Sequence, residues 1–190
     1  MNMTREELIE LFPEMELIQD KTLKEQTIRT WLKVCEACEW ESLTDIPFSG
    51  KFTADPDNLV YHTRMTTLFS HAIAVQSNAY METKVNVDYV VAGALLHDVC
   101  KPIEYSPKGG KSAWGKQITH SVYGICVARE EGMPLEILHI IASHTKLMGI
   151  PNQSLEAIIV HQCDDLAAAN AYLISLDMVK SMKDGSWIKR

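Results

Sequence analysis

Residues Val90 to Asp98 read VVAGALLHD, so seven apolar residues run directly into a histidine and an aspartate. An apolar run of this kind is typical of a buried segment. Two strong metal ligands at its end would lose hydration energy unless an ion or another partner satisfied them. Further candidates stand at wide intervals: His62 upstream, and His120, His144 and Asp164 downstream. Four histidines and two aspartates on separate helical segments are the donors that a divalent-metal site inside a helix bundle needs.

Local signals predict helices nearly throughout the chain. Thr4 and Glu7 form a capping-box pattern before a short helix that Pro13 interrupts. The other predicted helices cover about 22–40, 57–81, 87–100, 117–131, 134–144 and 154–173, with an irregular connection over 44–58. Adjacent residues on a helix point about 100° apart. His97 and Asp98 can therefore meet one ion only near a helix end, and Pro102 is expected to end their helix there.

The composition indicates a globular protein with a single core. The chain has 190 residues, of which 46% are apolar and 23% charged. It shows neither a secretory signal nor a run of roughly 18 apolar residues, so we expect a cytoplasmic protein that does not enter a membrane. The net charge of −7 argues against a nucleic acid polymer as partner. It allows a small phosphorylated substrate, because a bound metal supplies positive charge locally.

The five cysteines are expected to be reduced thiols. Cys35 and Cys38 form a CxxC pattern, but no second pair completes a four-ligand zinc site. We interpret them as two small residues that face the core.

The order His62, His97-Asp98, His120, His144 and Asp164 resembles the HD-domain superfamily of metal-dependent phosphohydrolases. The resemblance implies an all-α fold, an HD-domain-like helical bundle with the metal site in its core. We expect this domain to cover residues 56–180. An N-terminal helical extension over 1–55 would pack on the bundle, and 181–190 would form a tail.

The resemblance also implies a set of ligands. In this family the first histidine, the His-Asp pair and the final aspartate form the core site, which here gives His62, His97, Asp98 and Asp164. Members with two more histidines hold a second ion bridged by the Asp of the pair, and His120 and His144 fit those positions. The alternative is a single ion, with the extra histidines contacting substrate or supporting the ligands. The segment HQCDDL resembles the family's final motif and selects Asp164 over Asp165. Imidazole and carboxylate donors suit Fe, Mn, Co, Ni or Zn.

The same resemblance suggests the catalytic and substrate-binding residues. Asp98 would orient a metal-activated water, and Lys101 matches the lysine of the family's His-Asp-x-x-Lys. Lys101 would pair with Asp98 or with a substrate phosphate, unless it is only a solvated cation at a helix end. Apart from the resemblance, the basic, glycine-rich loop over 105–116 is expected to influence specificity, with Lys108, Lys111 or Lys116 meeting phosphate, unless it is only a solvated, flexible loop. His161 would contact substrate, support a ligand or simply pack in the core.

The preferred function is hydrolysis of a nucleotide or another small phosphate ester through a metal-activated water. Two alternatives stay open: a mixed-valence di-iron oxygenase of the HD type, and a nucleotide-binding or sensing module with little turnover. Oxygen dependence with two irons would distinguish the oxygenase. A homodimer is compatible with the sequence.

Overall fold

Helices make up the fold over residues 1–49 and 58–175, the part of the chain that the computed structural model describes. They are α1 (Arg5–Leu11), α2 (Lys21–Ala37), α3 (Leu59–Tyr80), α4 (Val87–Leu96), α5 (Lys101–Glu104), α6 (His120–Glu130), α7 (Leu135–Ser143) and α8 (Leu155–Ser175). Short 3-10 turns cover Pro13–Leu17 (η1), Leu43–Asp45 (η2) and Lys146–Met148 (η3). The predicted all-α class is confirmed. The expected tail over 181–190 and residues 50–57 of the irregular connection lie outside the described residues.

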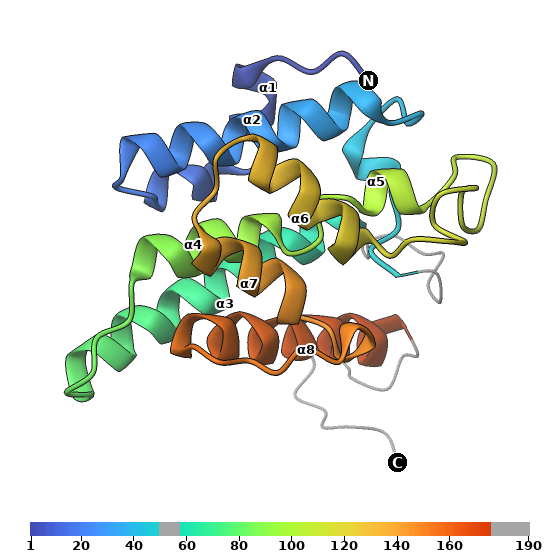
Figure 1. Ribbon diagram of the computed structural model, residues 1–190. Helices are drawn as coiled ribbons and strands as arrows, with labels where there is room; N and C mark the ends of the chain where they lie inside the picture. Colours follow the sequence, from blue (N-terminus) through green and yellow to red (C-terminus); the bar gives the residue numbers. More distant parts are fainter. Residues whose placement is uncertain (50–57, 176–190) are drawn as a thin grey trace, which may run out of the picture.

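Helix α4 occupies the middle of the molecule. Its residues from Val90 to Leu96 are all buried, as expected for a helix that is apolar on every side. It packs against α3, α7 and α8 on one side and against α2 and η1 on the other. In Figure 1, α8 forms the layer opposite α1 and α2, with α3, α4 and α7 between them. Gly93 allows this close packing, because a Cβ there would lie 2.6 Å from Cδ1 of Ile140 on α7.

The capping signals place most helix boundaries correctly. Thr4 and Glu7 form the predicted capping box, and the Asn58 side chain accepts a hydrogen bond from the Tyr61 amide at the start of α3. Gly132 follows α6 with a φ of 80°, a conformation that glycine adopts readily. These signals act through neighbouring residues of the chain, which is why the sequence reveals them.

The predicted helix over 87–100 is shorter in the structure. Helix α4 ends at Leu96, residues 97–100 form a turn, and α5 begins at Lys101. Pro102 therefore does not end the helix of the His-Asp pair. It lies in the first turn of α5, where its missing N–H is not needed. The turn lets His97 and Asp98 face a common centre, although they are consecutive.

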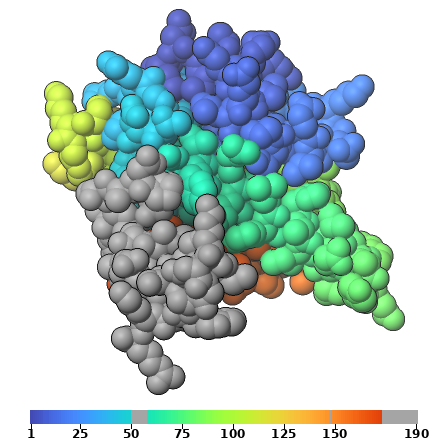
Figure 2. All heavy atoms as spheres, turned by 180° about the vertical axis from the view of Figure 1, so that it is seen from behind, coloured from blue at the N-terminus to red at the C-terminus, as the bar shows by residue number. Residues whose placement is uncertain are grey.

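The N-terminal helices share a buried core with the rest of the chain. Leu8, Phe12 and Trp31 belong to the same hydrophobic cluster as the residues of α4. The Trp31 Nε1 donates a hydrogen bond to the Leu95 carbonyl over 3.0 Å. Seen from behind, the same helices lie directly above α3 (Figure 2). The boundary between extension and domain stays a prediction.

Cys35 and Cys38 are both buried and free. None of the helices in the described ranges combines the length and apolar character that crossing a membrane requires.

Candidate metal centre

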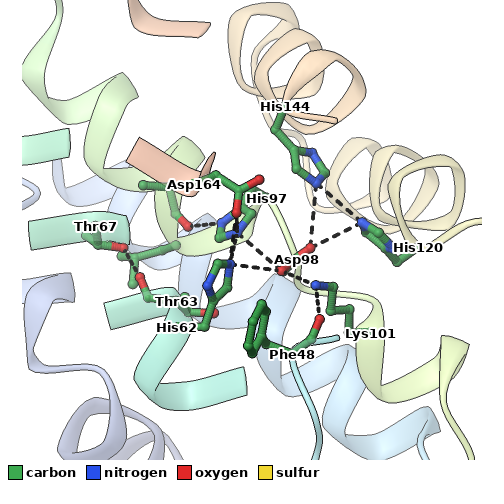
Figure 3. Close-up of polar contacts among 12 residues, drawn as sticks. Phe48, His62, Thr63, Thr67, His97, Asp98, Lys101, His120, His144 and Asp164 are labelled. Carbon is green, nitrogen blue, oxygen red and sulfur yellow. Dashed lines mark hydrogen bonds and ion pairs between the residues drawn. The ribbon is translucent and has the colours of Figure 1, made fainter. Parts of the chain in front are cut away.

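Five helical segments bring the six predicted ligands to one buried place (Figure 3). His62 lies in the first turn of α3, and His97 and Asp98 occupy the turn after α4. His120 is the first residue of α6, His144 directly follows α7, and Asp164 lies midway along α8. Five of the six are buried, and the Asp164 side chain is 18% exposed. Most ligands thus lie at or near helix ends.

The first group consists of His62, His97 and Asp164, whose ligand atoms all lie within 4.8 Å of one another. The His62 Nε2 is 3.2 Å from the His97 Nε2 and 3.0 Å from Oδ1 of Asp164. The neighbouring Asp165 is exposed, with its carboxylate 3.5 Å from Lys146. The structure therefore brings Asp164, and not Asp165, to the histidines.

The second group consists of Asp98, His120 and His144, whose ligand atoms also lie within 4.8 Å of one another. The two imidazole Nε2 atoms are 3.3 Å apart. Oδ1 of Asp98 lies 3.2 Å from the His120 Nε2 and 3.6 Å from the His144 Nε2.

Asp98 stands between the two groups. While its Oδ1 faces the second group, its Oδ2 lies 3.4 Å from the His62 Nε2 and 3.3 Å from the His97 Nε2. Each oxygen of one carboxylate therefore faces a different set of imidazoles, which is the arrangement that a bridging ligand requires.

Hydrogen bonds at Nδ1 direct the Nε2 atoms toward the centre. The Nδ1 of His97 lies 2.6 Å from the Ala94 carbonyl, and that of His144 lies 2.8 Å from the Ile141 carbonyl. His120 bonds through Nδ1 to a carboxylate oxygen of Glu104. A neutral imidazole that donates from Nδ1 presents a lone pair at Nε2. His120 and His144 as neutral rings thus turn two lone pairs toward each other, and a cation bound by both would satisfy them. The donors fit a divalent metal.

Neighbouring cationic and hydrogen-bonding groups keep the two carboxylates of the cluster ionised. Burial acts to raise the pKa of Asp98, but Lys101 and then His97 outweigh it and hold this pKa well below its usual value. Burial opposes ionisation of Asp164 too, yet the hydrogen bond from His62 and the charge of His97 lower its pKa. Two ionised carboxylates therefore lie among four imidazoles.

Lys101 is a buried cation beside the centre. Its Nζ lies 2.6 Å from Oδ2 of Asp98 and donates a hydrogen bond to the Phe48 carbonyl. Burial acts to lower the pKa of Lys101, but the charge of Asp98 outweighs burial and raises it. The reading of Lys101 as a solvated cation at a helix end is therefore wrong, because it is 9% exposed and paired with Asp98.

Two residues of the site were not predicted from the sequence. The Phe48 ring stacks on the His62 ring at 4.5 Å between centroids, and Glu104 contacts His120 through one oxygen. Phe48 is an apolar residue in an irregular segment, and Glu104 is one acid among many. Neither carries a local signal for this role.

The remaining predicted residues lie outside both ligand groups. Lys108 is exposed on the loop after α5. The Lys111 Nζ is 2.6 Å from the second oxygen of Glu104, behind His120. The His161 Nδ1 bonds to the His144 carbonyl over 2.5 Å. Lys111 thus contacts the residue that supports His120, and His161 contacts the backbone of the ligand His144.

Comparison with known proteins locates the family match on this site. The HD domain family model matches residues 59–169, a range that contains all six predicted ligands. The chain is also 33% identical over 112 residues to the dihydroneopterin 2',3'-cyclic phosphate phosphodiesterase of Methanocaldococcus jannaschii. That alignment covers 56% of this chain and 45% of the relative, so the match spans less than half of the relative's length. No solved structure matches the chain.

Proposed function

Because the chain belongs to the HD domain family, we propose that it hydrolyses small phosphate esters with the help of two divalent ions. The observation that carries the proposal is the orientation of Asp98, whose two oxygens face different pairs of histidines. A carboxylate between two ligand groups is suited to a two-metal site, where a pair of ions stabilises the attacking and the leaving oxygen.

The residues divide into two ligand sets that share Asp98. One set is His62, His97, Asp98 and Asp164, and the other is Asp98, His120 and His144. These nitrogen and oxygen donors suit Fe, Mn, Co, Ni or Zn. Bound divalent ions would supply a water of lowered pKa as the nucleophile and would stabilise negative charge on the phosphoryl group.

The protein's own side chains orient these parts. Lys101 holds Asp98 in its ionised form through the 2.6 Å contact to Oδ2, and its charge favours an anionic substrate nearby. His161 supports the end of α7 at the His144 carbonyl. Of the two loop lysines predicted to meet substrate phosphate, Lys111 contacts Glu104 and Lys108 is exposed, and we propose Lys108 for the direct contact.

The substrate we propose is a nucleotide or another small phosphate ester, encountered in the cytoplasm. The relative from Methanocaldococcus jannaschii is named for a cyclic phosphodiester of a pterin. Cyclic phosphodiesters therefore belong in the substrate panel together with nucleotides and phosphomonoesters.

Elemental analysis of the purified protein tests the two ligand sets. We expect about two ions per chain in the unmodified protein, about one in His120→Ala, and loss of metal and activity in Asp98→Ala with the helical content retained. The control is His139→Ala, because the His139 Nε2 accepts a hydrogen bond from the Gln153 amide outside the site. A count of about one ion in both the unmodified protein and His120→Ala would support a single ion, with His120 contacting substrate.

A phosphate-release assay across the panel tests the activity. Turnover with Mn, Co or Ni in the absence of oxygen supports hydrolysis, and substantial turnover by Asp98→Ala would remove this residue from the mechanism. Oxygen consumption by the iron-loaded protein would support the oxygenase. Tight nucleotide binding without turnover would support the sensing module.

A further inference from the structure

The histidines of the site are held in two different ways. His97 and His144 bond through Nδ1 to the backbone carbonyl three residues earlier in their own helical segments. His120 instead bonds through Nδ1 to the carboxylate of Glu104, which comes from α5. Among these three imidazoles, His120 alone has a charged acceptor behind it.

Glu104 is built into the protein interior. The residue is only 5% exposed, and its oxygens are divided between His120 on one side and Lys111 on the other. One carboxylate oxygen lies 2.6 Å from the Lys111 Nζ and the other contacts the His120 Nδ1, so both oxygens of Glu104 have a partner.

The loop after α5 keeps Lys111 and Glu104 together. The Ser112 amide donates to the Glu104 carbonyl over 2.8 Å, and the Ser112 hydroxyl donates to the Ile103 carbonyl over 2.6 Å. The Gly115 amide donates to the Ser112 hydroxyl over 2.9 Å. A Cβ at Gly115 would lie 2.1 Å from the Glu104 carbonyl oxygen, so only glycine permits this approach. Loop and carboxylate thus form one hydrogen-bonded unit.

We propose that Glu104, itself held by Lys111, is a positioning residue that strengthens metal binding at Asp98, His120 and His144. An anionic acceptor keeps the proton of the imidazole on Nδ1, fixes the ring orientation and makes Nε2 a stronger donor to a cation. The first ligand group has no contact with Glu104 among the described residues. The direct effect of Glu104 therefore falls on the ion at Asp98, His120 and His144.

This inference rests on the proposed two-ion site. The experiment is a Co²⁺ titration of the full chain, in which binding is measured by calorimetry and by the visible absorption of bound Co²⁺. Glu104→Gln preserves the size of the side chain and an acceptor oxygen but removes the charge. We expect one of two binding steps to weaken by about 10- to 100-fold, with the other step unchanged.

Lysine variants of the same loop test the contact between Lys111 and Glu104. Because the Lys111 side chain is 45% exposed, we expect Lys111→Met to weaken the same step by no more than about fivefold. The matched control is Lys116→Met, an exposed lysine of the same loop, which should leave both steps unchanged.

A double variant separates positioning from general loss of structure. In a His120→Ala background the Glu104→Gln change should have no further effect on Co²⁺ affinity, because the imidazole that Glu104 orients is gone. The inference is overturned if Glu104→Gln weakens both steps equally, weakens neither, or acts as strongly without His120. If the unmodified protein binds fewer than two ions, the two-ion proposal itself fails, and that outcome is visible before any variant is compared.

Discussion

Trp31 connects the N-terminal helices to the turn that carries His97 and Asp98. The residue is fully buried, and its Nε1 donates to the Leu95 carbonyl over 3.0 Å. In a continuing helix that carbonyl would accept from the Val99 amide, but α4 ends at Leu96 and the Val99 amide donates to the Leu96 carbonyl. The indole therefore satisfies an acceptor that the end of α4 exposes.

Trp31→Phe removes this N–H donor and the five-membered ring of the indole. An unsatisfied buried carbonyl costs about 1–3 kcal/mol, and the incompletely filled space adds roughly 1 kcal/mol. We expect the free energy of unfolding to fall by roughly 2–4 kcal/mol, a large share of the stability of a domain of this size. Urea denaturation followed by circular dichroism measures this difference.

Trp114→Phe is the matched control. Trp114 is 55% exposed and contacts the Tyr123 ring at 5.6 Å between centroids, so the same substitution should change stability by no more than about 0.5 kcal/mol. If Trp31→Phe cost no more than this control, the role of the indole at the end of α4 would be refuted.

Three further predictions concern the α5 loop and the cysteines. Gly115→Ala should lower the free energy of unfolding by more than about 1 kcal/mol, because its Cβ would lie 2.1 Å from the Glu104 carbonyl oxygen; a urea midpoint equal to that of the unmodified protein would contradict this. The folded-state pKa of Glu104, about 2, lies below the ordinary 4.5, so its ionised form stabilises the fold above pH 4.5 and this stabilisation is lost as the pH falls toward 2. The stability difference between the unmodified protein and Glu104→Gln, measured by urea denaturation of the metal-free forms, should therefore shrink over that range rather than stay constant. Cys126 is the exposed thiol, whereas the other four cysteines are buried and burial raises the pKa of Cys35 to about 12. Ellman's reagent should therefore react rapidly with Cys126 alone in the native protein, and Cys126→Ser should remove that phase; a remaining fast phase would show that a buried thiol is accessible.

Local signals explain why most of the fold was predictable. The capping box of Thr4 and the glycine stop at Gly132 depend on hydrogen bonds and dihedral angles within a few residues. The apolar run before His97 predicted a buried helix, because no exposed face is available in such a segment. The helix end was placed incorrectly, since Pro102 is compatible with the first turn of a new helix as well as with the end of an old one.

The roles of the loop residues depended on contacts that no local pattern encodes. Lys111 was predicted to meet substrate phosphate, which stays a prediction, and its contact with Glu104 was not predicted. Phe48 covers His62 from a segment that precedes the family match. Both contacts join residues whose partners are chosen by packing rather than by spacing along the chain.

Periodicity and caps were enough to predict the helical class, because they are properties of residues close together in the chain. The six candidate ligands came from the order of histidines and aspartates, which resembles the HD-domain family. Three relations were visible only in the folded chain: Asp98 faces two groups of histidines, Lys101 is buried against Asp98, and Glu104 lies behind His120. These relations depend on the turn over residues 97–100 and on how separate helices pack, and packing is settled by the whole core at once.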